Sequence, residues 1–157
     1  MRKFDVYVET SVWGAAADVE PAYYRKAADK LLTRADDFEF YVTDVVLAEV
    51  AAAAAVVRKE VEEVIKRASP SELEITADVT FLAGEYIKRG VFPARYEADA
   101  LHVAAACHYA MDYLVSYNFR HIVRVSRREL IKSANAILGV ATPQIISPEE
   151  LAEEEWG

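Results

Sequence analysis

Short apolar runs alternate with longer stretches of helical spacing along this chain. The runs are FDVYV at 4–8, FEFYV at 38–42, LEIT at 73–76, YLVS at 113–116 and QII at 144–146. Short runs that are rich in β-branched and aromatic residues and bounded by charge or turn residues are typical of buried strands. The pattern therefore predicts five strands.

The segments between the strands have helical periodicity or a composition rich in alanine, which favours helix. They span 20–34, 44–55, 57–68, about 77–89, the stretch that begins near Glu97, and 126–138, and Pro148 opens a last helix. Strands that alternate with helices, without tight hairpin signals, indicate a parallel sheet with helices on both faces. We therefore expect a three-layer α/β/α sandwich with a central, mostly parallel five-stranded sheet.

Length and composition favour one domain that spans residues 1–157. A chain of 157 residues with 54% hydrophobic residues is long enough for one buried core and short for two ordinary domains. It has no apolar run close to the roughly 18 residues that a membrane span needs, and its first residues do not resemble a secretion signal. Cys107 is the only cysteine, which suits a reducing compartment. We expect a cytoplasmic protein without membrane contact.

The charge is unevenly distributed. The formal net charge of −8 argues against a surface that binds nucleic acid non-specifically, because such binding depends on Lys and Arg. Residues 119–132, however, hold five basic side chains against one acid, while 149–157 hold five glutamates and no base. The basic stretch is compatible with a phosphate-bearing substrate, and a solvated helix face is its alternative explanation.

Three acids and one amide occupy comparable places in the predicted elements. Glu9 and Asn118 directly follow the first and fourth strands, Asp99 lies in the first turn of the helix before the fourth strand, and Glu49 lies in the helix after the second. Ligands bind at the carboxyl ends of strands in such sheets, so the four side chains converge if the first and fourth strands are neighbours.

A cluster of this kind requires a cation or protons. Two carboxylates about 4 Å apart repel by roughly 4 kcal/mol at an effective dielectric constant near 20. Oxygen ligands favour Mg²⁺ or Mn²⁺, whereas Zn²⁺ favours Cys and His. A divalent ion held by carboxylates can activate water and position a phosphodiester for in-line attack.

Other polar residues near these positions have simpler explanations beside a functional one. Asp112 precedes the fourth strand and so lies at the opposite end of the sheet, and Asp44 is placed to cap a helix. His102, three residues after Asp99, shares its helix face, where it can support the site or simply pack. Arg120 and His121 follow Asn118 and are the best candidates to meet a phosphate, with capping or packing of a short turn as the alternative.

Four segments resemble one known family. YVETSVWG, VTDVVLAEV, ADALHVAAA and DYLVSYNFRHI, in this order, resemble the PIN domain family and in particular its toxin-like nuclease branch. The resemblance extends from Val6 to the TPQIISPEEL ending. It implies a small parallel α/β/α nuclease fold, Mg²⁺- or Mn²⁺-dependent hydrolysis of single-stranded RNA, and frequent dimerisation. Many relatives are the toxin of a toxin–antitoxin pair, which implies an antitoxin protein as a partner.

The resemblance also assigns roles by position. Glu9 stands where the family usually has an Asp, Glu49 matches its helix glutamate, and Asp99 matches its central aspartate, so these three become the metal ligands. Asn118 falls where many members carry a fourth acid and completes the catalytic set. Thr10 and Ser11 match the hydroxyl pair that supports the first acid, and we assign them, with Arg120 and His121, to substrate binding.

The departures at Glu9 and Asn118 leave a second function open. A PIN-like domain with weakened chemistry would serve as an RNA- or protein-binding module. A metal-dependent phosphatase is a poorer fit, because Glu9 is followed by Thr10 and Ser11 without the expected aspartate pair.

Two features suggest contacts with a partner. The alanine run at 51–55 lacks bulk, so we expect it to pack closely against another element, which can be a second protomer. Aromatic residues early in the chain offer a further partner surface, with core packing as the alternative explanation (Trp13, Tyr23, Tyr24, Phe81 and Tyr86). A homodimer is therefore expected.

Overall fold

A five-stranded sheet forms the centre of the molecule. The computed structural model describes residues 2–17 and 22–155. Its strands lie in the order β3-β2-β1-β4-β5, and every neighbouring pair is parallel. They are β1 (Phe4–Val8), β2 (Phe38–Thr43), β3 (Ser71–Leu73), β4 (Tyr113–Val115) and β5 (Gln144–Ile146). The predicted parallel sheet is confirmed.

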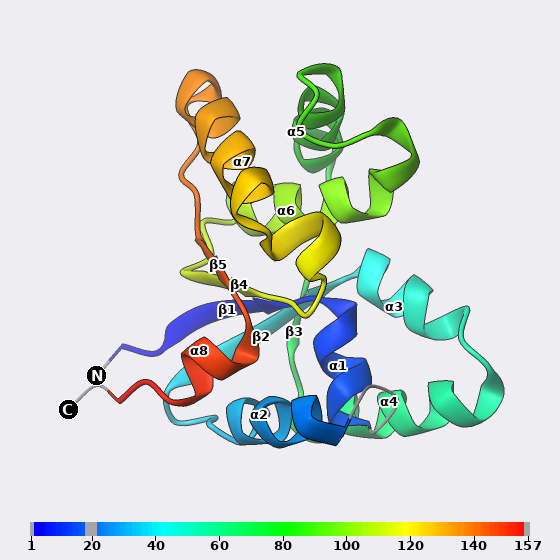
Figure 1. Cartoon of the computed structure of the whole chain (residues 1–157). Coiled ribbons are helices and arrows are strands. Elements are labelled where there is room, and N and C mark those ends of the chain that lie inside the picture. Colours follow the sequence, from blue (N-terminus) through cyan, green and yellow to red (C-terminus); the bar gives the residue numbers. More distant parts are fainter. Residues whose placement is uncertain (1, 18–21, 156–157) are drawn as a thin grey trace.

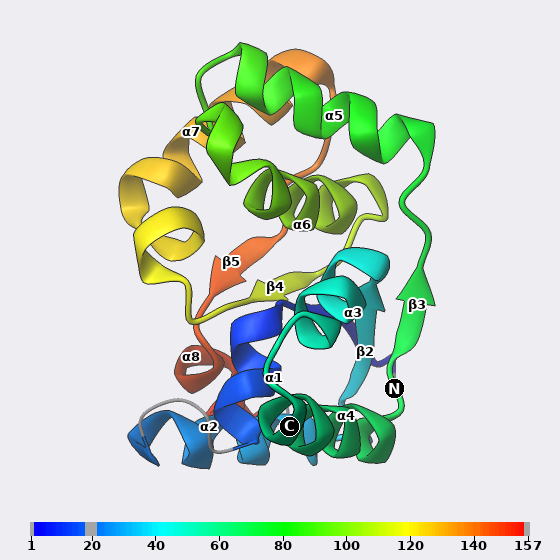
Figure 2. The same cartoon turned by 90° about the vertical axis from the view of Figure 1, so that its right-hand side faces the viewer.

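Helices cover both faces of this sheet. Figure 1 shows α5, α6 and α7 over one face and α1, α2, α4 and α8 over the other, and Figure 2 shows the same layers after a quarter turn. The bounds are α1 (Thr10–Ala16), α2 (Ala22–Leu32), α3 (Asp44–Ala51), α4 (Ala55–Ala68), α5 (Ala77–Lys88), α6 (Glu97–His108), α7 (Val125–Leu138) and α8 (Pro148–Ala152). The predicted three-layer sandwich is therefore confirmed. Residues 20 and 21 of the predicted helix 20–34 lie outside the described residues.

The strand order reverses beside β1. The chain proceeds outward from β1 to β2 and β3, and then returns to the other edge of β1 with β4 and β5. Val6 pairs with Tyr113 and Val8 with Val115, so the carboxyl ends of β1 and β4 lie side by side. This is the switch point at which open α/β sheets bind their ligands.

The core explains why the central elements are so apolar. Val6, Tyr7 and Val8 of β1 are fully buried, as expected for a parallel strand covered on both faces. Helix α6 is buried along most of its length, and its alanines Ala104–Ala106 let it lie close to its neighbours, chiefly α5. A helix that is apolar on all sides belongs in such a position.

Helix α1 was not predicted, because Gly14 interrupts a short segment. Tertiary contacts stabilise it instead: Val12 and Trp13 are fully buried, and Trp13 Nε1 donates to the Val8 carbonyl at 3.0 Å. The predicted partner surface is therefore wrong for Trp13, and also for Tyr86, which is fully buried. Tyr23 and Phe81 are exposed, and their contact with a partner stays a prediction.

The alanine run does not pack as expected. The predicted helix 44–55 ends at Ala51, the chain turns through 52–54, and α4 begins at Ala55. This turn lets α4 bury Val61 and Val64 and pack beside α1, a gain that outweighs the helix propensity of alanine. The run is mostly exposed, so close packing within the chain was a wrong expectation, whereas contact with a second protomer stays a prediction.

Smaller differences concern element ends. Strand β3 spans Ser71–Leu73, so it shares only Leu73 with the predicted run 73–76, and the bounds of that run were wrong. Thr76, the last residue of the run, instead caps α5 by accepting from Val79 N. Thr43 rather than Asp44 holds the N-cap position of α3, and Asp44 lies exposed in its first turn. Among the described residues, no helix is long and apolar enough to cross a membrane.

Candidate active site

Glu9 follows β1 directly and caps helix α1. Its Oε2 accepts from Ser11 N at 3.1 Å, and its Oε1 accepts from Ser11 Oγ at 2.6 Å and from Ser116 Oγ at 2.5 Å. The side chain is only 5% exposed, and the positive end of the helix stabilises its negative charge. The carboxylate is thus held at the switch point. Its Oε1 accepts two hydrogen bonds and its Oε2 accepts one.

Glu49 projects from α3 with one oxygen held by the protein. Oε1 accepts from Thr10 Oγ1 at 2.8 Å and lies 2.5 Å from His102 Nε2. Oε2 has no hydrogen-bond partner among the described residues. Partial burial opposes ionisation, but the hydrogen bond and charge of His102, with the bond from Thr10, outweigh it and lower the pKa of Glu49. Glu49 is therefore a charged carboxylate with one oxygen available to a ligand.

His102 connects this carboxylate to the core. The ring is fully buried, its Nδ1 lies 2.6 Å from Tyr7 Oη, and Tyr7 Oη lies 2.9 Å from Thr43 Oγ1. Burial lowers the pKa of His102, but the hydrogen bond to Glu49 and the charges of the nearby acids outweigh it and raise the pKa. The raised pKa favours the charged imidazolium, and in that form His102 donates to Glu49 and to Tyr7, which leaves Tyr7 to donate to Thr43.

Asp99 faces the same crevice from the first turn of α6. Asn118 Nδ2 donates to its Oδ1 at 3.3 Å, and Oδ2 has no partner within the described ranges. Burial raises the pKa of Asp99, and the charges of Glu9 and Glu49 raise it further, against the opposing effect of His102 and His121. The three acids therefore lie within electrostatic range of one another, although they come from three separate elements.

The segment after β4 is fixed by its own hydrogen bonds. Tyr117 N donates to Ser11 Oγ and Asn118 N to Ser116 Oγ, each at 2.9 Å. Asn118 Oδ1 accepts from His121 N and so caps a short π-helical turn, Phe119–Val123. This ties the segment after β4 to the residues after β1.

This turn presents the two residues predicted to meet a phosphate. Arg120 is exposed, and the ring of His121 lies 4.0 Å from that of Tyr96, centroid to centroid. Their role in substrate binding stays a prediction.

The structure thus brings Glu9, Glu49, Asp99 and Asn118 together, as the sequence suggested. Ser11 supports the first acid as expected, whereas Thr10 supports Glu49 instead. Both hydroxyl groups already bind carboxylates, so their assignment to substrate binding stays a prediction without support from these contacts. Asp112 lies at the other end of the sheet, where it pairs with Arg2 and accepts from Asp5 N.

Three supporting residues escaped sequence reasoning, and a fourth was weighed as a packed residue. Ser116, Tyr7 and Thr43 lie within or directly after strands and read as ordinary strand residues. His102 is both packed and functionally placed. The sequence feature that could have indicated the role of His102 is its position on the same face of an apolar helix as Asp99. A histidine buried there needs hydrogen-bond partners, which the residues of the site provide.

The donor set suits a hard divalent cation. Ligand atoms of Glu9, Glu49 and His102 all lie within 4.8 Å of one another. His102 Nε2 already lies 2.5 Å from Glu49 Oε1, so the carboxylate oxygens are the better donors. The less occupied oxygens of Glu9, Glu49 and Asp99 fit the preference of Mg²⁺ and Mn²⁺ for oxygen.

Comparisons with known proteins agree with the fold. The PIN domain family model matches residues 6–128. The structure of VapBC2 from Rickettsia felis, bound to a DNA fragment from its promoter, has a TM-score of 0.55 and 18% identity over 79% of this chain and 95% of that chain. Mycobacterium tuberculosis VapC20, described as a sarcin-ricin loop cleaving toxin, has a TM-score of 0.57 and 16% identity over 74% of this chain and 92% of that chain.

These comparisons confirm the resemblance read from the four sequence segments. At such low sequence identities the structural likeness shows only a shared fold. Membership of the family rests on the match of the family model. A search of curated proteins found no match.

Proposed function

The chain belongs to the PIN domain family, and from this premise we propose that it is a metal-dependent endoribonuclease that hydrolyses phosphodiester bonds in single-stranded RNA. One observation carries the proposal: ligand atoms of Glu9 and Glu49 lie within 4.8 Å of each other at the end of β1, and Asn118, which follows the neighbouring strand β4, donates to Asp99. Ligands bind at this position in open α/β sheets, and a cluster of acids favours a cation.

The proposed cofactor is Mg²⁺ or Mn²⁺, held by Glu9, Glu49 and Asp99. When bound, such an ion lowers the pKa of water and neutralises charge on the phosphodiester. The protein orients the ligands: Thr10 and His102 hold one oxygen of Glu49, and Asn118 holds one oxygen of Asp99. We assign the binding of substrate phosphate to Arg120 and His121 on the adjoining turn, where Arg120 is exposed.

The biological setting follows the relatives. VapBC2 is a complex and VapC20 is described as a cleaving toxin, so we extend the proposal to the toxin of a toxin–antitoxin pair. It includes an antitoxin protein as partner, a homodimer and a cytoplasmic location.

A second candidate function is a binding module with weakened chemistry. The observation in its favour is that Glu9 accepts from three donors and that the carbonyl of Asn118 accepts from His121 N. Both groups have less capacity to bind a cation than free carboxylates. This candidate requires RNA binding that is indifferent to Mg²⁺ and unaffected by Asp99→Asn.

The deciding experiment is cleavage of single-stranded RNA in Mn²⁺ by the wild type, Asp99→Asn and Glu97→Gln. Glu97 lies exposed in the same first turn of α6, so its substitution removes the same charge outside the crevice. The proposal requires that Asp99→Asn loses activity by at least about a hundredfold, because altering a residue that only orients a metal ligand already costs roughly 10- to 100-fold, while Glu97→Gln cleaves normally. Equal activity in all three proteins would remove Asp99 from the mechanism.

A further inference from the structure

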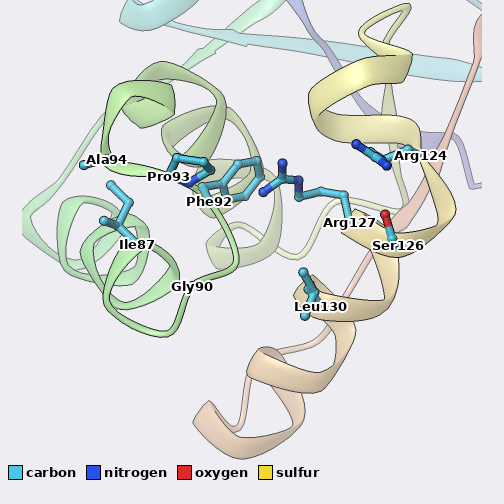
Figure 3. A pocket seen from close by; sticks show the side chains of 9 residues that line it. All are labelled: Ile87, Gly90, Phe92, Pro93, Ala94, Arg124, Ser126, Arg127 and Leu130. Atoms are coloured by element: carbon cyan, nitrogen blue, oxygen red, sulfur yellow. The ribbon is translucent and has the colours of Figure 1, made fainter.

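A cavity of about 690 Å³ lies between the α5–α6 connection and the first turns of α7 (Figure 3). Ile87, Pro93 and Leu130 give it an apolar wall. Arg124, Ser126 and Arg127 supply its polar groups. Among the described residues, none of those that line it is acidic, which is notable in a chain with a net charge of −8.

Arg127 is anchored within this cavity. Its Nη1 donates to the Val91 carbonyl, and its guanidinium carbon lies 4.7 Å from the centroid of the Phe92 ring. Figure 3 shows the side chain reaching from α7 across to Phe92. The cation is therefore held in place by a carbonyl and an aromatic face, and it does not need to be ordered when an anion binds.

Arg124 and Ser126 remain available. The guanidinium of Arg124 and the hydroxyl of Ser126 have no hydrogen-bond or ion-pair partner within the described part of the chain. Arg124 is exposed and holds the N-cap position of α7, a helix of 14 residues, and Ser126 lies in the first turn. The cavity thus contains a guanidinium and a hydroxyl that have no partners among the described residues, and it lies at the N-terminus of a helix. Each of these polar groups favours the binding of an anion.

The cavity adjoins the acidic crevice. Arg124 directly follows the turn Phe119–Val123, and Asn118, which caps this turn, donates to Asp99. Burial and the charge of Arg124 lower the pKa of Arg127, and the charge of Asp99 opposes this shift. The ring of Tyr96 lies against that of His121, and the charge of Tyr96 also raises the pKa of Arg127. A strand bound at the acids can therefore continue over the turn at Arg120 and His121 toward the cavity.

We propose that this cavity binds one nucleotide of single-stranded RNA next to the nucleotide at the acidic crevice. Arg124 and Ser126 bind its phosphate, and Arg127 supplies a fixed positive charge inside the cavity. The apolar wall formed by Ile87, Pro93 and Leu130 contacts its base or ribose. This subsite rests on the proposed ribonuclease function. An RNA strand matches both halves of the cavity, because each nucleotide combines one phosphate with one apolar ring face.

The charge half of the proposal is tested by RNA binding without cleavage. Fluorescence anisotropy of a labelled single-stranded RNA of mixed sequence is measured in EDTA for the wild type, Arg124→Gln and Lys132→Gln. Lys132 is exposed on the same helix and does not line the cavity, so it controls for lost charge. Arg124→Gln is expected to weaken binding about tenfold, and its salt slope should fall by about 0.7 for one lost phosphate contact.

The apolar half needs a variant that changes no charge. Leu130→Trp fills part of the cavity, and Ile137→Trp places the same bulk on an exposed position two turns further along α7, away from the cavity. Leu130→Trp is expected to weaken RNA binding several-fold, whereas Ile137→Trp binds like the wild type. Thermal melting of each variant confirms that the fold is retained.

Equal RNA affinities in the wild type, Arg124→Gln and Leu130→Trp would overturn the subsite, and so would equal losses in Lys132→Gln and Arg124→Gln. A glutamate-rich peptide that binds more tightly than RNA, and loses binding in the same two cavity variants, would assign the cavity to a protein partner instead. Failure of the ribonuclease proposal is distinguishable, because it appears as absent cleavage in Mn²⁺, whereas the binding assay requires no cleavage.

Discussion

His102 Nε2 lies 2.5 Å from Glu49 Oε1, which joins a fully buried ring on α6 to a carboxylate that is 39% exposed on α3. Behind the ring, Tyr7 and Thr43 continue the hydrogen bonds into the sheet. Since Thr10 binds the same Glu49 oxygen, the carboxylate is directed by two donors, while its other oxygen has no hydrogen-bond partner among the described residues. The sheet and α6 thereby fix a group that an exposed helix position alone would leave mobile.

Removing this support should weaken metal binding more than it weakens the fold. His102→Leu keeps an apolar side chain in the core and removes the donor to Glu49. We expect Mn²⁺ affinity to fall by about tenfold, the lower end of the range for residues that orient a ligand. The measurement is the Mn²⁺ concentration that half-saturates the rise in melting temperature. His108→Leu, at the exposed end of the same helix, is the control, and equal affinities would show that Glu49 needs no support from His102.

The same pair should make stability depend on pH in EDTA. The pKa of Glu49 is lowered from 4.5, so its contribution is complete above that value and is lost as the pH falls through the lower pKa of the folded state. The pKa of His102 is raised from 6.5, so its contribution is complete below 6.5 and is lost as the pH rises through the higher folded value.

The difference in unfolding free energy between wild type and His102→Leu should therefore be largest between pH 4.5 and 6.5. Urea denaturation at several pH values measures it. A difference that grows steadily toward alkaline pH would contradict the charged pair.

Metal binding should stabilise the protein through Asp99. A ligand that binds only the folded state adds about 2.7 kcal/mol when its concentration is 100 times its dissociation constant. Millimolar Mn²⁺ should raise the melting temperature of the wild type and of Glu97→Gln, and leave Asp99→Asn unchanged. Absence of a rise in the wild type would count against a metal site.

Replacing Asn118 should make the crevice more dependent on a cation. Asn118→Asp removes the donor to Asp99 and places a second carboxylate beside it, where two charges about 4 Å apart repel by roughly 4 kcal/mol at an effective dielectric constant near 20. The melting temperature in EDTA should fall, and the rise caused by Mn²⁺ should exceed that of the wild type. An unchanged Mn²⁺ response would mean that position 118 is remote from the ion.

The close packing of α6 can be tested independently of function. Ala105→Leu adds bulk where the helix is fully buried, and overpacking of this kind costs about 1–3 kcal/mol. Ala98→Leu makes the same change at an exposed position of α6 and should alter stability little. Urea denaturation of both variants measures the difference, and similar stabilities would contradict tight packing around α6.

The sequence by itself determined the parallel three-layer sandwich, and it singled out the four residues of the candidate centre, whose roles stay predictions. Strands β1 and β2 are largely apolar because helices cover both faces of the sheet. Such a run involves only neighbouring residues, so it can be recognised in the sequence. Glu9, Glu49, Asp99 and Asn118 follow from their places at element ends together with the family resemblance.

Only the tertiary structure decided the partners of these residues. Helix α1 depends on the burial of Val12 and Trp13, the turn after Ala51 depends on the packing of α4 on α1, and neither gain is visible in local propensity. The same holds for the Glu49–His102 pair, whose residues are 53 positions apart. A hydrogen bond between two helices, and the burial of both partners, exist only after the sheet has brought those helices together. The pKa shifts of Glu49 and His102 and the orientation of Glu49 therefore depend on the tertiary structure.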